Sequence, residues 1–563
     1  MGVSKLSEKY GKFFDGKQGY FAPEVQPVDV PVPIGGWDAI SPLAKMDPQY
    51  GPIMTNWVPR PGWLEVRGGY NVWAQGITGS AVESLMPYLG ASVQKLFAAS
   101  NGKIYDCSVY GMPSLSKSGF LNNRWKYINF TPSLGLNYLI IVNGIDTPQI
   151  FNGTTWVNWN VTLPGALNPN TITNITIFKQ RIWVTTDSTS VYYLGTSAIS
   201  GAFTEFPLGQ FISKGGVFKA IGDWTVDGGQ GPDDLIVFNS TQGEYVVYKG
   251  TDPSNPNAFA LVGSFVLPRS IGYRPFTKLG AELAVITLQG VIPLSQALPY
   301  DPSGVRSVAF TNRIQNAMLG AAQLYNANFG WQLQSFPQQG LLLLNIPTTE
   351  NVSQIQYVMN NYTGAWTQFT GWNANCFETF NDSLYFGDNT GNVNLAYAGS
   401  LDLVSPVLAD CQFAFNTFGE AGRIKNMTML RPIIVANGTL TPTLSVNVDF
   451  DNVAPTAPVV ILGASGAEWD VSLWDTGVWS GGTSITKDWQ SVLALGTYLA
   501  VRVQVNYGGT STGGGSGVGS VFDTGVFDTM IFDGNGATTS SGQLVPLLQL
   551  NAFETLIQMG GLI

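Results

Sequence analysis

The 563-residue chain contains no histidine. This absence excludes Ser-His and Cys-His nucleophile pairs, histidine general bases and histidine metal ligands at once. Cysteine is also scarce, because the three residues Cys107, Cys376 and Cys411 lie far apart and form no CxxC spacing. An odd number of widely spaced cysteines does not indicate a disulfide framework, so we interpret them as buried free thiols.

The sequence also has few charged residues and no long apolar runs. Charged residues make up only 11% of the sequence, and the formal net charge is -10. A protein that grips nucleic acid through its phosphates is usually basic, so tight DNA or RNA binding is disfavoured. No run approaches the ~18 apolar residues of a membrane-spanning helix. The N-terminus lacks the apolar region of a signal peptide, so we expect neither a secretion signal nor a membrane segment.

Glycine and aromatic residues are abundant instead. The chain has 66 glycines, and aromatic residues reach 12%. Few charges together with many turn formers and many aromatic side chains are typical of a β-rich, well-packed chain and not of disorder. A chain of this length exceeds one ordinary core, so two to four domains are expected.

Short apolar strands separated by small polar turns recur along the middle of the chain, and 340–399 shows the pattern most clearly. Seven hairpin centres start 42 to 58 residues apart, at Lys95, Tyr138, Arg181, Asp234, Leu283, Leu341 and Ser383. A four-stranded propeller blade takes ~40–50 residues. We therefore predict an all-β fold with a β-propeller of about seven blades over 57–400. An irregular series of β-sandwiches is the alternative.

Two segments depart from this pattern. Residues 1–56 are rich in proline and poor in periodicity, which predicts an extended arm. The arm either lies across a neighbouring surface or wraps its own subunit. Residues 311–328 have a helical apolar face that includes Ile314, Met318 and Tyr325, with Thr311 as a candidate cap. We predict a helical insertion in a blade, which packs on the rim or contacts a neighbouring subunit.

After residue 400 the pattern changes to the alternation of a half-exposed sandwich sheet, so we predict a C-terminal β-rich, β-sandwich-like domain over 401–563. The related motifs WDTGVW (474–479) and FDTGVF (522–527) lie inside it. Residues 508–520 consist mostly of glycine, serine and threonine, which predicts a flexible loop. Its glycines form a candidate channel gate: Gly508, Gly509, Gly513, Gly514, Gly515 and Gly517.

The motifs indicate no chemistry. DTGVW is similar to the Asp-box of sialidase propellers, which is a structural turn, and we interpret the Asp-aromatic turns in the same way. The sequence leaves open a calcium site formed by Asp523, Asp528 and Asp533, although their spacing is not that of an EF-hand. The sequence contains neither a GxxxxGK[ST] loop nor a GxSxG elbow. We therefore assign no catalytic, cofactor-binding or metal-binding residue and predict no enzyme activity.

Several stretches resemble the tail nozzle, or hub, proteins of short-tailed bacteriophages, some of which are called packaged-DNA stabilisation proteins. The stretches that carry the resemblance are NWVPRPGWLEVRGGY (56–70), VESLMPYLG with KLFAASNGKIYDC (82–107), NANFGWQ (326–332), QYVMNNYTGAWTQFTGWNANCFETFNDSLYFGD (356–388) and WDVSLWDTGVW (469–479). Together they cover most of the chain, while 508–520 and the far C-terminus contribute little.

The resemblance implies a structural virion protein of the tail. Such proteins look like β-propeller subunits assembled as a homo-hexameric ring below the portal and its adaptor protein. The ring prolongs the DNA channel, retains the packaged genome, anchors fibres or spikes and opens for ejection. Double-stranded DNA would pass through the lumen without tight binding. The alternative is a glycan-binding or glycan-cleaving propeller, a tail-attached lectin or depolymerase.

Overall fold

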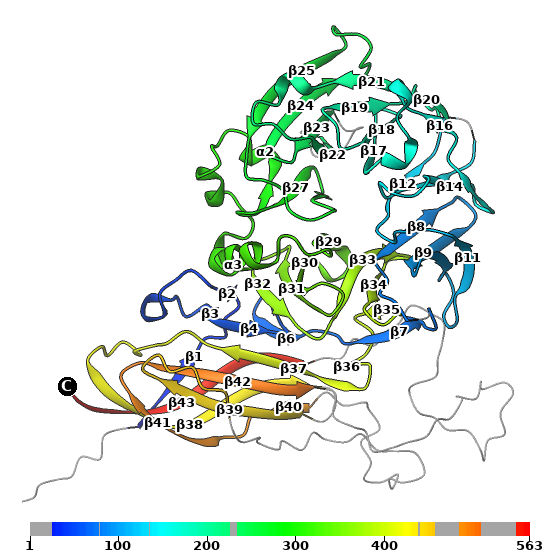
Figure 1. Cartoon of the computed structure of the whole chain (residues 1–563). Helices are drawn as coiled ribbons and strands as arrows, with labels where there is room; N and C mark the ends of the chain where they lie inside the picture. Colours follow the sequence, from blue (N-terminus) through cyan, green and yellow to red (C-terminus); the bar gives the residue numbers. More distant parts are fainter. Residues whose placement is uncertain are drawn as a thin grey trace, which may run out of the picture.

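A computed structural model gives the fold of the chain (Figure 1). It describes residues 25–77, 79–133, 135–225, 234–436, 440–455, 484–507 and 548–562. A propeller of antiparallel sheets and a β-sandwich lie side by side in it. The predicted all-β class, with a propeller and a sandwich-like C-terminal domain, is confirmed.

The first four blades are four-stranded antiparallel meanders whose strands follow the order of the sequence. Blade 1 comprises β8 (Ser84–Leu89), β9 (Gln94–Ser100), β10 (Lys103–Asp106) and β11 (Ser114–Ser118). Blade 2 comprises β12 (Lys126–Phe130), β13 (Tyr138–Val142), β14 (Gln149–Phe151) and β15 (Trp156–Asn158). Blade 3 comprises β17 (Asn174–Phe178), β18 (Arg181–Thr185), β19 (Ser190–Tyr193) and β21 (Thr204–Pro207). Blade 4 comprises β22 (Phe218–Trp224), β23 (Leu235–Ser240), β24 (Glu244–Gly250) and β25 (Phe259–Val266).

The last three blades differ in how they are completed. Blade 5 has β26 (Phe276–Leu279), β27 (Glu282–Thr287) and β28 (Gly290–Pro293), followed by the helices α2 (Leu294–Ala297) and α3 (Gln315–Tyr325). Blade 6 comprises β29 (Gln332–Phe336), β30 (Leu341–Thr349), β31 (Ser353–Asn360) and β32 (Trp366–Phe369). Blade 7 comprises β33 (Ala374–Phe380), β34 (Ser383–Asp388), β35 (Val393–Ala396) and the much earlier strand β7 (Tyr70–Ala74). A strand from before blade 1 therefore closes the last blade.

The second strand of every blade is the one that the sequence pattern predicts. Strands β9, β13, β18, β23, β27, β30 and β34 each begin within one residue of a predicted hairpin start. These strands are buried almost throughout, since a neighbouring blade covers each of their two faces. A strand buried on both faces reads as a continuous apolar run, which is the signal that the sequence carries.

Packing between neighbouring blades supplies the propeller core. A separate cluster of buried apolar side chains lies at each of the seven seams between blades. At the seam between blade 7 and blade 1, Phe380 and Tyr385 pack with Leu85 and Leu96. Apolar packing therefore closes the ring of blades, in addition to the hydrogen bonds of β7.

Helix α3 agrees with the helical insertion predicted over 311–328. Its apolar face, however, does not have the considered role of contacting a neighbouring subunit. Ile314 and Met318 are fully buried, and Tyr325 packs against the same cluster, over β28 and β30 of its own chain. A face that its own blades cover is not available to a neighbouring subunit. Thr311 does not cap the helix either, because its hydroxyl accepts a hydrogen bond from the backbone N–H of Val291 at 3.2 Å.

In the described ranges, the sandwich has two sheets around one core. The first sheet contains β1 (Val25–Val30), β5 (Trp57–Arg60), β6 (Trp63–Val66), β38 (Arg423–Ala436), β40 (Ser484–Thr486), β41 (Gln490–Gly496) and β43 (Leu548–Leu562). The second contains β4 (Ile53–Thr55), β37 (Ser405–Gln412), β39 (Leu440–Val448) and β42 (Leu499–Tyr507). Side chains from both sheets fill a single apolar core between them.

The N-terminal segment belongs to this sandwich, which shifts the predicted domain boundary. Strand β1 pairs with β43, so the described part of the arm lies on its own chain. The short strands β2 (Gly36–Trp37) and β3 (Tyr50–Gly51) pair with each other, and β2 also pairs with β32. Strands β5 and β6 contribute Trp57 and Leu64 to the sandwich core, so the propeller begins at β7 and not at residue 57.

A buried ion pair lies where the propeller meets the sandwich. Strand β4 pairs with β32 of blade 6 and with β37 of the sandwich. Next to it, Arg67 donates to both carboxylate oxygens of Asp402 in β36 (Leu401–Asp402), at 2.8 and 2.6 Å. Its other bonds go to the side chain of Asn56 and to the carbonyls of Gly68 and Thr370. All five N–H donors of the guanidinium are thereby used.

Candidate functional site

The inner strands of the propeller surround a polar cavity, which we call the axial cavity. Because every blade starts from its innermost strand, these strands run in the same direction and their first residues meet at one end. The cavity measures about 340 Å³, at the lower end of the range for small-molecule pockets. Its polar lining comes from blades 2 to 7: Lys126, Tyr127, Asn174, Thr176, Asp223, Arg274, Thr277, Lys278, Gln332, Gln334 and Glu378.

A tyrosine and a glutamate from blades 2 and 7 meet at this cavity. Tyr127 donates its hydroxyl proton to Glu378 at 2.5 Å. Burial raises the pKa of Glu378 to about 7, and the hydrogen bonds from Tyr127 and from the Thr379 N–H oppose this only in part. Burial and the adjacent carboxylate together raise the pKa of Tyr127 well above its usual value. Glu378 therefore exchanges a proton near neutral pH, as general acids and bases do.

A second carboxylate on the axis is part of an ion pair. Asp223 of blade 4 accepts from Lys278 of blade 5 at 2.5 Å and from the hydroxyl of Thr176 at 3.0 Å. These residues tie three neighbouring blades together toward the other end of the cavity. Since Lys278 is half exposed, the pair contributes little beyond orientation.

Three cations gather at the end where the inner strands begin. Within the described ranges, Arg274 donates only to neutral acceptors there: the hydroxyl of Ser84 at 2.8 Å, the carbonyls of Trp125 and Glu83 at 2.9 and 3.5 Å, and the amide oxygen of Gln332 at 3.2 Å. Lys126 places its ammonium 4.3 Å from the ring centroid of Tyr273.

These cations have no close counter-ion. Within the described ranges, no carboxylate lies within ion-pair distance of Lys126, Lys219 or Arg274. The pKa of Lys126 is well below its usual value, first because of burial and then because of the charges of Lys219 and Arg274. Burial also lowers the pKa of Lys219, and the exposed Asp187 acts against this.

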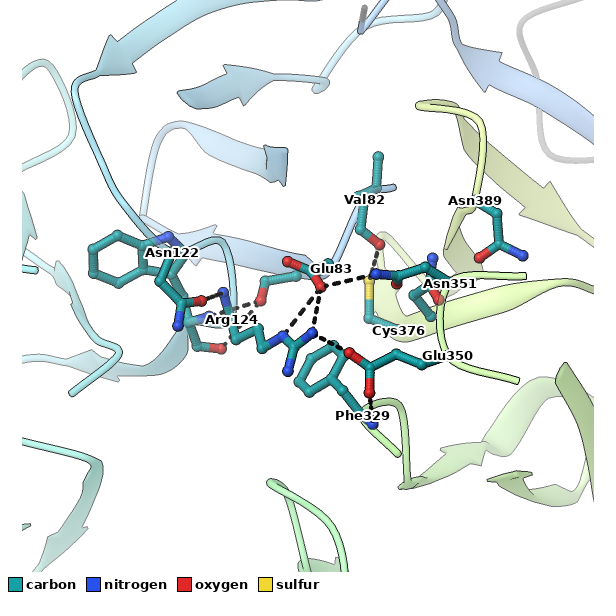
Figure 2. A network of polar contacts seen from close by, with 12 residues as sticks. Val82, Glu83, Asn122, Arg124, Phe329, Glu350, Asn351, Cys376 and Asn389 are labelled. Atoms are coloured by element: carbon teal, nitrogen blue, oxygen red, sulfur yellow. Dashed lines mark hydrogen bonds and ion pairs between the residues drawn. The ribbon is translucent and has the colours of Figure 1, made fainter. Parts of the chain in front are cut away.

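A second cavity of about 380 Å³ adjoins this end, and we call it the mouth cavity. Lys219, Tyr273 and Phe329 line it together with several asparagines. Figure 2 shows that Arg124 lies between Glu83 and Glu350, at 3.0 and 2.5 Å. The guanidinium also stacks over the ring of Phe329 at 4.2 Å. Arg124 thus contacts both carboxylates but offsets only one of their two negative charges, and Lys219 has no ion-pair partner within the described ranges.

The two cavities fit a small polar ligand and exclude a nucleic-acid duplex. The major groove of B-DNA alone is ~12 Å wide, so a duplex does not fit a 340 Å³ space between packed strands. In the part of the chain that the structure describes, no group of three or more cysteine and acidic residues is arranged to hold a metal ion. No helix in that part is long and apolar enough to cross a membrane.

The three cysteines are buried and unpaired, as predicted. Burial raises the pKa of the Cys107 and Cys376 thiols to about 12, and that of Cys411 rises as well. The thiolate is the nucleophile and metal ligand, so these side chains are inert packing groups at neutral pH.

Most residues singled out from the sequence lie away from the axial cavity or outside the described ranges. The six candidate gate glycines within 508–517 and the Asp-aromatic motifs at 474–479 and 522–527 lie outside the described residues. The proposed calcium ligands at 523–533 do too. Asp234 lies at the start of its strand and pairs with Lys179 at 3.0 Å, as an ordinary ion pair.

Sequence reasoning missed the charged residues of the cavities. Lys126, Lys219, Arg274 and Glu378 lie in or beside the inner strand that precedes each predicted hairpin centre. A charged residue placed just before a long apolar strand, repeated from blade to blade, is the signal that would have found them. The sequence does not show which of these charged side chains lie close together, because each comes from a different blade.

Comparison with known proteins leaves the family open. No family model matches the chain, and no curated protein matches it either. Raptor from Chaetomium thermophilum matches at 11% identity with a TM-score of 0.36, covering 58% of this chain and 28% of its own. PorZ, a surface component of the type-IX secretion system of Porphyromonas gingivalis, matches at 14% identity with a TM-score of 0.34, covering 64% of this chain and 45% of its own. The computationally designed Ika8 protein matches at 10% identity with a TM-score of 0.31, covering 58% of this chain and 99% of its own.

Proposed function

We propose that this chain is a structural virion protein, the tail nozzle of a short-tailed bacteriophage, which has no enzyme activity and assembles as a homo-hexameric ring. The observation that carries the proposal is a pair of exposed apolar patches on different parts of the molecule. A head-to-tail ring requires two different surfaces on each subunit, because the first surface of one copy meets the second surface of the next.

The blade-1 patch lies on and beside β11, at the outer edge of the propeller (Figure 1). It consists of Val109, Tyr110, Met112 and Leu115, whose exposed fractions are 76, 73, 86 and 56%. Monomeric proteins seldom expose several large apolar side chains so close together, and such patches mark interaction sites.

The sandwich patch lies on the outer face of the first sandwich sheet. It consists of Leu493 and Leu495, which are 90 and 63% exposed. Both leucines lie on β41, which pairs with the first half of β38, while the exposed Ile485 of β40 lies farther along the same strand, opposite Val435. Ala494 between the two leucines points into the core, and the alternation of β41 therefore directs both leucines outward.

In the proposed ring, DNA passes through the central lumen that the six subunits surround. It does not pass through the axial cavity of a single propeller, which is too small. A formal charge of -10 per chain gives -60 for six copies (6 × -10). A lumen of that sign repels phosphates, so the duplex slides without sticking.

The remaining partners and the location follow from the proposed role. The ring would contact the portal-proximal adaptor protein and anchor fibres or spikes in the tail of the virion. A particle component must persist without repair, which depends on slow unfolding. The closure of blade 7 by β7 supports this, because it leaves the ring of blades without an open end.

The oligomeric state tests the proposal. Wild-type protein is expected to sediment as six copies of the 60.5 kDa chain, about 363 kDa. Met112→Asp and Leu493→Asp each place a charge in one patch and should reduce the mass to that of one chain. Each variant keeps the other patch, so an equimolar mixture should form a two-chain complex of about 121 kDa, measured by sedimentation velocity.

The control is Tyr362→Asp, since Tyr362 is 84% exposed but lies in neither patch. This variant should retain the wild-type mass. A wild-type protein that stays a single chain at high concentration, or patch variants that both keep the full ring, would contradict the proposal. In particles, a six-fold ring coaxial with the portal would distinguish a nozzle from a peripheral trimeric depolymerase.

A second candidate is the glycan-binding or glycan-cleaving propeller, and the Tyr127–Glu378 pair favours it. Sialidases use a tyrosine nucleophile, and Glu378, whose pKa is about 7, can take up the tyrosine proton when it is in its carboxylate form. Incubation of the purified chain with host capsular glycan tests this candidate. Turnover that Glu378→Gln abolishes would replace the structural proposal.

A further inference from the structure

We propose that the propeller carries a binding site for a small divalent oxyanion of the phosphate class, formed by Lys126, Lys219 and Arg274 where the axial and mouth cavities adjoin. The two cavities are neighbours, because the ammonium of Lys126, which lines the first, lies 4.3 Å from the ring centroid of Tyr273, which lines the second. The three cations come from blades 2, 4 and 5, so only the closed propeller brings them together.

The carboxylates of Glu83, Glu350 and Asp223 already have cationic partners other than these three. Glu83 and Glu350 share Arg124, so these three residues together keep a net charge of -1, against the +3 of Lys126, Lys219 and Arg274. Asp223 is engaged by Lys278 toward the other end of the cavity.

Two acidic groups remain near the three cations. Glu378 already accepts the proton of Tyr127 and is partly neutral at pH 7, because its pKa is about 7. Asp187 is exposed and acts on Lys126 and Lys219 only at a distance. Holding uncompensated charges of one sign together is costly, and an anion between them removes that cost.

The donor set favours a doubly charged oxyanion over a carboxylate. Arginine recognises a carboxylate through a free planar fork, but the terminal nitrogens of Arg274 already donate to Ser84, Trp125 and Gln332. The attraction therefore comes mainly from the lysines, which act as point charges with three donors each. Point charges distinguish ligands by net charge, so an anion of charge about -2 gains most.

Titration with inorganic phosphate tests the site in the full-length protein. Phosphate is expected to raise the melting temperature with saturable dependence on concentration, whereas chloride at matched ionic strength should not. Acetate should bind at least about tenfold more weakly, which corresponds to a difference of about 1.4 kcal/mol.

Two variants and a control decide the assignment. Lys126→Gln and Lys219→Gln should each weaken phosphate binding at least about tenfold. Both remove a charge that has no partner, so the folded state should persist. The control Lys249→Gln removes an exposed lysine of β24 and should leave binding unchanged. Equal stabilisation by phosphate and chloride, equal binding of acetate, or unchanged binding in both Lys126→Gln and Lys219→Gln would each overturn the proposal.

Discussion

Replacing Arg67 by methionine is expected to lower the free energy of unfolding by about 3–5 kcal/mol. The side chain of Arg67 is fully buried, and that of Asp402 is only 12% exposed. Methionine fills similar space but leaves the carboxylate of Asp402 at the joint of the two domains without its opposite charge. Denaturant unfolding at pH 7, followed by tryptophan fluorescence, measures the difference from wild type.

Two further variants separate the ion pair from its surroundings. The double variant Arg67→Met/Asp402→Leu should be more stable than Arg67→Met alone, because no unpaired charge remains. Arg423→Gln breaks an exposed pair with Glu420 at 3.7 Å and should change stability by less than about 0.5 kcal/mol. A loss below about 1 kcal/mol for Arg67→Met would show that the pair does not secure the joint.

Between pH 5 and 8, the wild type is expected to lose about 2–3 kcal/mol of stability that the Glu378→Gln variant keeps, since one pKa unit corresponds to about 1.4 kcal/mol. Burial raises the pKa of Glu378 from 4.5 to about 7, so the folded state binds this proton more tightly than the unfolded chain does. Its contribution is therefore fully present below pH 4.5 and is lost as the pH rises through 7. Glutamine has the same shape, carries no charge and still accepts the hydrogen bond from Tyr127.

Denaturant midpoints at several pH values measure this effect. Glu420→Gln serves as the control, because that carboxylate is about half exposed and should leave the wild-type pH profile unchanged. The same slope in wild type and in Glu378→Gln would show that this group is not the source of the pH dependence. The double variant Glu378→Gln/Tyr127→Phe then shows whether the hydrogen bond adds stability of its own.

Much of the propeller could be predicted from the sequence because its strongest signals are local. Each second strand lies between two blades, so it is apolar on both faces, and small polar turns flank it. The hairpins at 341–360 and 383–396 therefore stand out without any tertiary information. The helix at Gln315–Tyr325 was visible for the same reason, since its apolar spacing is a local property.

The closure and the domain boundary could not be predicted in this way. Strand β7 reads like any other short strand, and its pairing with β35 joins residues more than 300 positions apart. Strands β5 and β6 likewise precede the propeller in sequence but pack in the sandwich core. The partners of β5, β6 and β7 depend on which apolar faces remain uncovered after the blades have formed.

The sequence by itself determined the β class, the hairpin period and the buried state of the cysteines, because hydrophobic patterning and turn residues act over a few neighbouring positions. Only the tertiary structure decided where the charges meet. Lys126, Lys219, Arg274 and Glu378 come from four different blades and meet only in the closed propeller. The pKa shifts of Lys126, Lys219 and Glu378 arise mainly from burial near the propeller axis. Electrostatic interactions depend on distance through space and on burial, and neither is encoded in the spacing of residues along the chain.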